Sequence, residues 1–544
     1  MDVIKTSLII AIGITLYYLL LQWPVDAPSN DVAYLEGESI NTLNDSESLL
    51  SKPLEPLSSL GETTEKVTPS EKNYYVIENE NLSLYLDPIT GRFELSLLNT
   101  ISKTKDSPEP FKILGPTYDE ELNRENIYFA NSGFYTRTQG YLNPSFSKIS
   151  QEDVSGGGTV YTLEGSSRGM SFSRKIEMPD TGYQIVVEDE IRSSIEQEIS
   201  ATPYVVIERD GSTIDQTSFM YTYLGPVFSS TKDTYEKYDF GDIRESSYQN
   251  KSTGGWVALI QHYFLSAWIP DENEEYLYQG RYGNNSGRYS LGYTSRDFIL
   301  SYGESATTKN TLYVGPKLPK ELAKIEENLD LTVDYGFLWW LGKPMYWLLD
   351  LGHSFFNNWG LAIIFLTVVL KIATWPLSAK AYVSMGKMRE LGPRLQLLQE
   401  KHGNNKQAMS QEMMEIYKTE GVNPLGGCLP MFAQMPFFLA FYWVLIETVE
   451  LRHSPFFFWI DDLSARDPYF ILPILNAAGM YLSQKLTPTP PTADPMQAQM
   501  MKFFPLVFAG FFAFFPSGLV LYWLINMVIQ IFQQWWYSRK AIST

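Results

Sequence analysis

Hydrophobic and polar positions change their pattern several times along the chain, beginning with an uncharged stretch near its start. Residues 7–23 contain no charged side chain, and Lys5 precedes them. These 17 residues make about 25 Å of helix, which approaches the ~30 Å apolar thickness of a bilayer. A cleaved signal peptide is the alternative, but no small-residue cleavage site follows Trp23. We therefore predict an uncleaved transmembrane anchor over residues 1–23.

The next stretch, residues 24–72, is polar and acidic. It is rich in Ser, Glu, Thr, Pro and Asn, and it shows no regular apolar period. Such a segment buries too little apolar surface to offset the entropy of ordering the chain. We predict a flexible acidic linker over residues 24–72.

From residue 73 onward, apolar and polar side chains alternate in short stretches, as in residues 82–86 (LSLYL) and 93–97 (FELSL). Alternation of this kind indicates strands with one buried face. Turn-forming pairs such as Asp87-Pro88 and Asp210-Gly211 separate the stretches. We predict a large all-β domain of stacked antiparallel sheets, followed by a short helix at 319–328, within residues 73–343.

The pattern then becomes that of a membrane protein. Trp347, Leu351 and Phe355 recur at helical spacing, which predicts an amphipathic interfacial helix over residues 344–358. Apolar runs follow at 359–375, 426–446, 469–484 and 503–536. The last run would be about 50 Å long as one helix, so we predict two helices that meet at residues 515–518. With the anchor, the total is six membrane spans, five of them within residues 359–544.

Basic residues set the expected orientation of these spans. The loop 376–425 and the C-terminal tail hold most of the Lys and Arg side chains near the spans, at Lys380, Lys387, Arg389, Arg394, Lys401, Lys406, Lys418, Arg539 and Lys540. Short loops rich in Lys and Arg stay in the cytoplasm. We predict that both termini are cytoplasmic and that the β domain lies in the periplasm.

Composition excludes several kinds of chemistry. The net charge is −20, and Cys428 is the only cysteine, so no intrachain disulfide can form. The four histidines are scattered without the spacing of metal ligands, and no HExxH, Walker A or nucleophile-elbow pattern occurs. The acidic stretch 24–95 also disfavours DNA binding by this region, because phosphate contact needs Lys and Arg. We predict no metal, no cofactor and no catalytic residues.

Lys371 interrupts an otherwise apolar predicted span. It either extends to the cytoplasmic headgroups or faces a hydrated cavity within the bundle. Thr367 lies one turn earlier on the same helical face, and Gln434, Tyr522 and Asn526 fall in other predicted spans. These polar side chains either hold helices together or line a hydrophilic groove for substrates.

The loop 376–425 predicts a helical hairpin with arms of about 20 residues. Apolar residues recur at helical spacing in both arms. Either the two stripes pack on each other, or their methionines provide an adaptable binding surface. The methionines concerned are Met385, Met388, Met409 and Met413.

Several longer motifs resemble the YidC family of bacterial inner-membrane insertases, which has mitochondrial and chloroplast relatives. These are residues 423–430 (NPLGGCLP), 434–436 (QMP), 494–497 (DPMQ) and 515–523 (FPSGLVLYW). In the β domain, residues 254–258 (GGWVA) and 263–270 (YFLSAWIP) resemble the family's periplasmic module. The similarity extends over nearly the whole chain except the acidic linker.

The resemblance implies a five-helix insertase core around a hydrophilic groove that opens to the cytoplasm and to lipid, and a periplasmic β-supersandwich. Lys371 stands where the family usually has arginine, and Thr367 matches the family's threonine. Tyr522 and Trp523 match its aromatic pair, although a second tyrosine is more common. In the family, substrate helices contact positions that correspond to Phe438 and Phe511.

The implied activity is ATP-independent insertion and folding of membrane proteins, not enzymatic catalysis. The implied partners are nascent membrane proteins, the Sec translocon (SecYEG and SecDF), the ribosome, the signal recognition particle receptor and membrane lipids. Two other functions stay open on the residues alone: a transporter or channel, and a membrane-anchored carbohydrate-active β domain. Against the first, no repeat relates the span pairs; against the second, no acid–base pair stands out.

Overall fold

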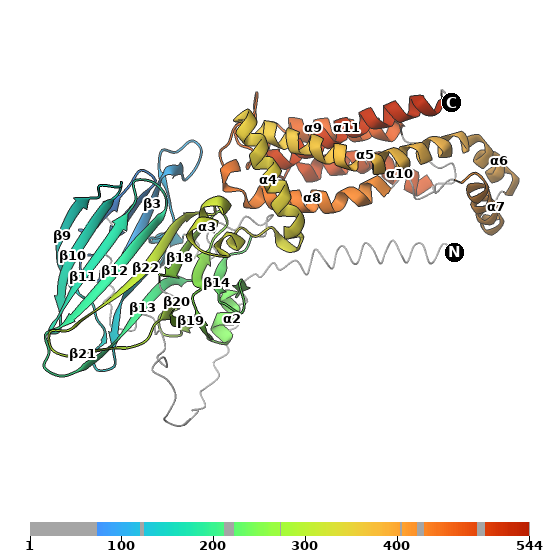
Figure 1. The fold of residues 1–544 in the computed structure, drawn as a ribbon. Coiled ribbons are helices and arrows are strands. Elements are labelled where there is room, and N and C mark those ends of the chain that lie inside the picture. The colour runs from blue at the N-terminus through green and yellow to red at the C-terminus, as the bar shows by residue number, and fades with distance from the viewer. Residues whose placement is uncertain are drawn as a thin grey trace. The chain divides into compact units, whose positions relative to one another are not determined.

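The structure is a computed structural model that describes residues 73–119, 124–211, 222–271, 274–402, 405–421, 429–486 and 495–542. All of these residues fall within one compact unit (Figure 1). The predicted anchor and acidic linker, over residues 1–72, lie outside the described residues. The strands occupy the first part of the described chain and the long helices the second.

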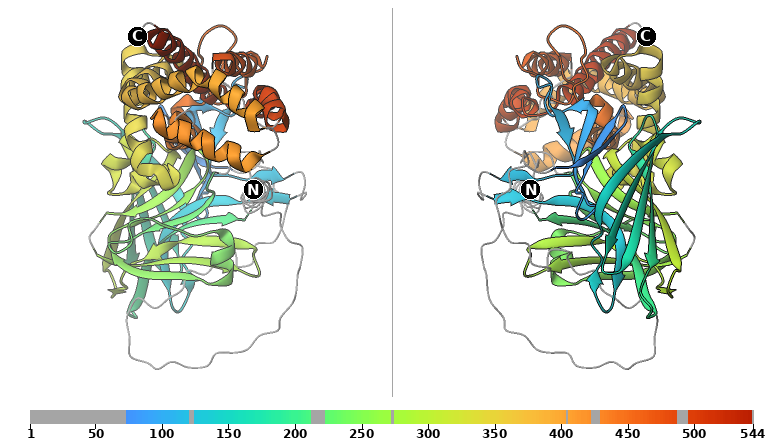
Figure 2. Two further views of the ribbon diagram at one scale, coloured as in Figure 1. Left: turned by 90° about the vertical axis from the view of Figure 1, so that its right-hand side faces the viewer. Right: turned by 90° about the vertical axis from the view of Figure 1, so that its left-hand side faces the viewer.

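Two large antiparallel sheets form the strand region (Figure 2). The strands of the first sheet are, in order, β1 (Tyr75–Glu78), β2 (Leu82–Leu86), β3 (Phe93–Ser102), β7 (Tyr128–Thr136), β13 (Ile199–Asp210), β20 (Arg288–Thr294), β19 (Glu275–Gly283) and β16 (Tyr248–Thr253). Three short strands pair with this sheet, namely β4 (Pro110–Lys112), β8 (Gly140–Tyr141) and β21 (Phe298–Leu300).

The second sheet runs β15 (Glu236–Lys237), β14 (Gly225–Ser229), β17 (Trp256–Ile260), β18 (Phe264–Pro270), β22 (Ser305–Pro316), β12 (Gln184–Ser193), β11 (Met170–Met178), β10 (Thr159–Ser167) and β9 (Ser145–Asp153). Two small elements complete the region, the hairpin β5 (Thr117–Asp119) with β6 (Arg124–Asn126) and the helix α2 (Phe240–Glu245). The predicted β-sandwich is confirmed.

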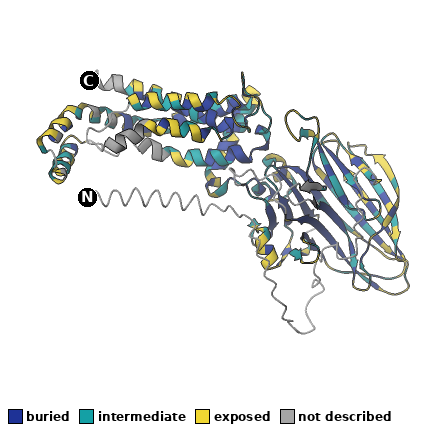
Figure 3. Cartoon of the chain, turned by 180° about the vertical axis from the view of Figure 1, so that it is seen from behind, coloured by how far each residue is buried: buried dark blue, intermediate teal, exposed yellow. Residues whose placement is uncertain are grey.

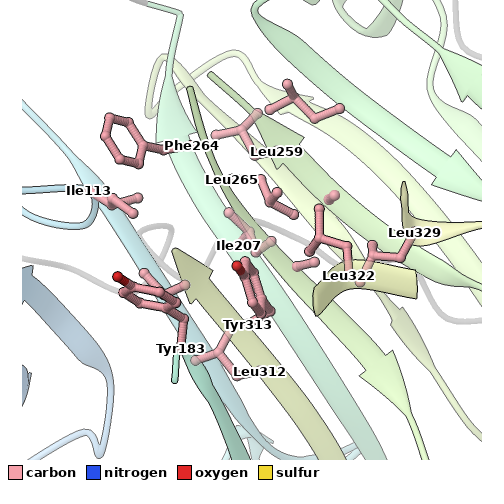
Figure 4. Close-up of a cluster of buried hydrophobic side chains, with 14 of the residues drawn as sticks. Ile113, Tyr183, Ile207, Leu259, Phe264, Leu265, Leu312, Tyr313, Leu322 and Leu329 are labelled. Carbon is pink, nitrogen blue, oxygen red and sulfur yellow. The ribbon is translucent and has the colours of Figure 1, made fainter. Parts of the chain in front are cut away.

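Whether a strand is buried on one face or on both depends on whether other elements cover its second face. Alternate residues of β11 are buried, as expected for a strand with one face in solvent. Every residue of β17 and β18 is buried instead. Leu322 and Leu329, which follow the last strand, belong to the same buried cluster as Leu265 and Tyr313 (Figure 4). This cover explains why these strands are apolar on both faces.

The helical region begins with α3 (Pro319–Ile325) and the 3₁₀ turns η2 (Leu329–Thr332) and η3 (Gly336–Leu338). The longer helices follow as α4 (Trp339–Phe356), α5 (Trp359–Glu390), α6 (Gly392–His402), α7 (Lys406–Thr419), α8 (Leu429–Glu447), α9 (Ile471–Leu486), α10 (Pro495–Phe512) and α11 (Ser517–Ile542), with the turn η5 (Val449–Leu451) after α8. The predicted break in the last apolar run is confirmed, because α10 ends at Phe512 and α11 begins at Ser517.

Several helix boundaries differ from the prediction. Helix α5 continues through Pro376 to Glu390, whereas the sequence predicted its end at residue 375. A proline removes one helical hydrogen bond but does not by itself end a long helix in a packed bundle. The arms of the hairpin are therefore shorter than expected, with 11 residues in α6 and 14 in α7. Helix α4 begins at Trp339, before the predicted residue 344.

Exposed positions recur along the long helices (Figure 3), and many of these positions hold apolar side chains. Examples on α9, α10 and α11 are Ile474, Tyr481, Leu506, Val507, Val528 and Phe532. Among the described residues, one helix segment, Trp359–Met388, has both the length and the hydropathy of a membrane span. Two shorter helix segments, Gln434–Glu447 and Phe503–Phe512, are also apolar. The prediction of six spans is not tested by these observations.

Candidate functional site

Lys371 lies inside the helical bundle. It occupies α5, and only 6% of the residue is exposed. Its amine donates a hydrogen bond to the side-chain oxygen of Gln434 on α8, at 3.2 Å. A lysine that extends to the headgroups would keep its amine in water. The amine of Lys371 therefore points toward the neighbouring helices and not toward the headgroups.

The hydrogen bonds continue from Gln434 to α11. The side-chain amide of Gln434 donates to the side-chain oxygen of Asn526. The amide of Asn526 in turn donates to the backbone oxygen of Tyr522, at 3.0 Å. Each amide thus uses its oxygen as an acceptor and its nitrogen as a donor. One chain of side-chain hydrogen bonds therefore connects α5, α8 and α11.

A small cavity adjoins this chain of hydrogen bonds. Its volume is about 20 Å³, which is enough for roughly one water molecule. The wall consists of Leu370, Lys371, Thr374, Leu377, Ser378, Gln434, Phe437, Tyr522 and Asn526.

The charge of Lys371 has no acidic partner in the described part of the chain. Its hydrogen bond goes to a neutral amide, and no carboxylate there forms an ion pair with it. A cation held among apolar helices without a counter-charge is costly.

Not every residue predicted for the groove reaches the cavity. Thr367 is buried one turn before Lys371, but its hydroxyl donates to the backbone oxygen of Ile363 at 2.7 Å. It does not line the cavity. Thr374 and Ser378 do line it, and the sequence analysis missed them. Their positions, three and seven residues after Lys371, share its helical face, so helical spacing was the available signal.

Trp523, Phe438 and Phe511 belong to one aromatic cluster. The ring of Phe438 lies 4.9 Å from that of Trp523, which also contacts the rings of Phe508 and Phe512. Phe511 lies 6.0 Å from Phe508 and is half exposed. The structure therefore brings α8, α10 and α11 together at a surface of aromatic rings.

Two of the hairpin methionines face its interior. Met388 and Met413 pack against a small core formed by Leu391, Leu395 and Tyr417. Met409 is half buried, and the side chain of Met385 lies outside the described part. Ion pairs also join the two arms, including Arg394–Glu420 at 2.7 Å. Met414 and Leu397 are exposed instead.

A helical bundle with apolar outer faces and a buried polar chain, joined to a β-sandwich, defines a membrane-embedded protein with a large domain outside the bilayer. Two family models match: "60Kd inner membrane protein" over residues 351–544 and "YidC periplasmic domain" over residues 75–348. The chain belongs to the YidC family of membrane protein insertases.

Full-length relatives agree with this assignment. The chain is 37% identical to "Membrane protein insertase YidC" of Azotobacter vinelandii, over 99% of both proteins. It is 38% identical to the protein of the same name from Pseudomonas fluorescens SBW25, over 99% of this chain and 98% of the relative. The relative from Cellvibrio japonicus is 41% identical over 85% of this chain and 84% of its own length. By family, the protein is therefore an inner-membrane protein with a periplasmic β domain.

Proposed function

We propose that this protein inserts integral membrane proteins into the inner membrane and assists their folding. One observation supports this most directly. Lys371 is buried among apolar helices, hydrogen-bonded to Gln434, and has no acidic partner in the part of the chain that the structure describes. A cation in this position is suited to attract the polar or acidic flank of a substrate that must cross the bilayer.

The cavity limits how this attraction operates. It has room for about one water molecule. A substrate tail must therefore separate α5 from α8 and α11, or replace the hydrogen bond between Lys371 and Gln434. The amine of a lysine acts as a point charge and lacks the planar fork of arginine. We expect attraction of acidic tails in general, without a fixed two-point contact to one carboxylate.

Phe438 and Phe511 provide the apolar side of the same process. Both belong to the aromatic cluster around Trp523, and the ring of Phe511 is half exposed. A hydrophobic substrate helix gains free energy when it moves from water to an apolar surface or to lipid. In the proposed function the helix passes along this cluster while its polar flank passes Lys371.

Six membrane spans with both termini in the cytoplasm form part of the proposal. Exposed apolar side chains on α9, α10 and α11 support contact with lipid. Helix α9 has 16 residues and α10 has 18, which correspond to about 24 Å and about 27 Å. Helices this short fit a locally thinned bilayer, across which a polar segment travels a shorter distance.

The proposed partners are nascent membrane proteins, the Sec translocon, the ribosome and the signal recognition particle receptor. The hairpin α6–α7 supports contact on the cytoplasmic side, because basic side chains such as Arg394 and Lys401 are exposed there. Exposed cations attract nucleic-acid phosphates and anionic lipid headgroups.

Photocrosslinking tests the proposed route. A photoreactive amino acid at Phe438, Phe511 or Lys371 is expected to form adducts with a stalled nascent membrane protein. Ile372 is the matched control, because it adjoins Lys371 on α5 but is 64% exposed on the outer face. Adducts from Ile372 alone, or equal adducts from all four positions, would contradict a defined route along the cluster.

A further inference from the structure

Helix α8 ends in contact with the β-sandwich. Its last residue, Glu447, forms an ion pair with Lys317, which directly follows β22. The two side chains are 3% and 2% exposed, respectively. Removing two charges from water is unfavourable unless each satisfies the other. This pair therefore connects two elements that are 130 residues apart in sequence at one buried point.

His262 forms a hydrogen bond with the last turn of α8. It lies in the turn between β17 and β18, and its Nε2 is 2.9 Å from the backbone oxygen of Ile446. Burial, together with the nearby Lys317, lowers the pKa of His262 to about 3, so the ring is neutral. A carbonyl only accepts, so Nε2 carries the proton and donates it. The last carbonyls of a helix lack partners within the helix, and His262 supplies one.

Arg452 adds a third contact just beyond η5. Its two terminal nitrogens donate to the backbone oxygens of Ser102 and Lys103, at 2.7 and 2.6 Å. Its guanidinium also lies 5.2 Å from the centre of the Phe111 ring and 5.9 Å from that of Phe264. A planar guanidinium that donates twice and stacks on rings is held in a narrow range of orientations. These contacts reach the first sheet as well as the second.

These contacts hold the same helix that carries Phe438 and Gln434. Phe438 lies nine residues before Glu447 on the same helix, or about 14 Å away. Gln434, which bonds Lys371, lies one turn before Phe438. No proline lies between Phe438 and Glu447, so a shift at Glu447 moves Phe438 and the aromatic cluster with it. Pro436 interrupts the helical hydrogen bonds between Phe438 and Gln434.

We propose that the ion pair Lys317–Glu447, assisted by His262 and Arg452, fixes the outer end of α8 to the β-sandwich and thereby positions the helix that contacts substrates. Lys317, Glu447 and His262 are positioning residues, which act through Phe438. The consequence for substrates rests on the proposed function. The fixation of α8 itself does not, and it can be measured separately.

A cysteine next to Glu447 reports whether the contact is closed. Thr448 is 2% exposed, and replacing Cys428 with serine leaves a Thr448→Cys variant with one thiol. We expect a water-soluble maleimide to label this thiol at least roughly tenfold more slowly than a Phe458→Cys thiol, because labelling requires local opening. Phe458 is 92% exposed, so its cysteine variant gives the labelling rate of an unprotected thiol.

Two single substitutions break the pair and two others control for them. Lys317→Met and Glu447→Gln each leave one buried partner unpaired, so labelling at Thr448→Cys should accelerate roughly tenfold. The double variant Lys317→Met/Glu447→Leu replaces the pair by apolar contact and should restore slow labelling. Lys320→Met removes only the exposed pair with Asp350 and should leave the rate unchanged.

The same variants then enter the crosslinking experiment at Phe438. Opening of the contact should lower adducts with the nascent chain several-fold, and the double variant should recover them. Unchanged labelling in both single variants would overturn the fixation of α8. Faster labelling with unchanged adducts would overturn the positioning role alone. Failure of the parent protein to crosslink would contradict the proposed function. The labelling rates would still show whether the ion pair fixes α8 to the β-sandwich.

Discussion

Lys371 and Lys317 are both buried lysines, but their surroundings differ. Lys317 is neutralised by Glu447 of its own chain. Lys371 bonds the neutral amide of Gln434 and pairs with no carboxylate among the described residues. A buried charge with an internal partner holds a structure together, and one without a partner is available to a ligand. This difference supports an architectural role for Lys317 and the proposed role of Lys371 in substrate insertion.

Substitutions at Lys371 separate charge from shape. We expect Lys371→Glu to lower insertion of substrates with acidic translocated tails by roughly tenfold, because attraction becomes repulsion. Lys371→Arg keeps the charge and should stay within about twofold of the parent. Protease protection of the translocated tail in cells measures both, with a substrate that has an uncharged tail as control. Equal insertion by all three proteins would remove Lys371 from the mechanism.

A second buried charge pair lies inside the β-sandwich. Arg174 of β11 and Asp189 of β12 lie 2.6 Å apart and are 3% and 6% exposed. We expect Arg174→Met to destabilise the domain by about 3–5 kcal/mol, because it leaves Asp189 buried and unpaired. Thermal unfolding of the full chain in detergent gives the measurement. Lys148→Met, which breaks the exposed pair with Glu164, should change stability by less than about 1 kcal/mol.

At the scale of elements, small residues decide how closely α4 and α5 approach. A side chain at Gly352 of α4 would place its Cβ 2.9 Å from the Phe365 ring and 3.1 Å from the Ala362 backbone of α5. These separations are shorter than ordinary van der Waals contact, so only glycine fits without movement. Helix α5 carries Lys371, so the α4–α5 contact also helps to place the polar chain.

Enlarging Gly352 should therefore separate the two helices. We expect Gly352→Leu to lower the stability of the helical region by about 1–3 kcal/mol through overpacking. Gly510 on α10 provides a contrasting position, because a Cβ there has open space around it. Gly510→Ala should raise stability by about 0.5–1 kcal/mol through its higher helix propensity. Unfolding in detergent followed by tryptophan fluorescence tests both, and a neutral Gly352→Leu would disprove the close contact.

At the scale of the whole molecule, the end of α8 joins the two regions of the chain. The contacts there combine a buried ion pair, a neutral histidine and an arginine on two carbonyls. The groups that act on His262 are the cations Lys317 and Arg452, which disfavour its protonation, and the Ile446 carbonyl, which favours it. The histidine therefore makes this contact sensitive to acid.

The direction of the pH effect follows from proton linkage. The pKa of His262 falls from an ordinary value of 6.5 to about 3 in the folded protein, so the unfolded chain binds the proton more readily between these values. The contribution is fully present above pH 6.5 and is lost as the pH falls, by about 2 kcal/mol at pH 5. The maleimide reacts with the thiolate, so each rate is divided by that of the exposed Phe458→Cys thiol at the same pH. This ratio should rise for Thr448→Cys between pH 7 and pH 5. His262→Gln keeps a hydrogen-bond donor for the Ile446 carbonyl but does not titrate, so it should flatten the pH dependence of labelling. An unchanged pH dependence in this variant would show that His262 is not its cause.

The sequence by itself determined the alternation of the strands, the break between α10 and α11 and the apolar character of the bundle, because these depend on local periodicity and on breaks in it. It also indicated Lys371, Gln434 and Asn526 as polar residues in apolar runs. It did not show that these residues bond one another, that Thr367 points elsewhere, or that α5 continues through Pro376. Only the tertiary structure decided these points, because they depend on which helices pack together. The pairing of Lys317 with Glu447 is of the same kind, since no local pattern relates residues so far apart in the chain.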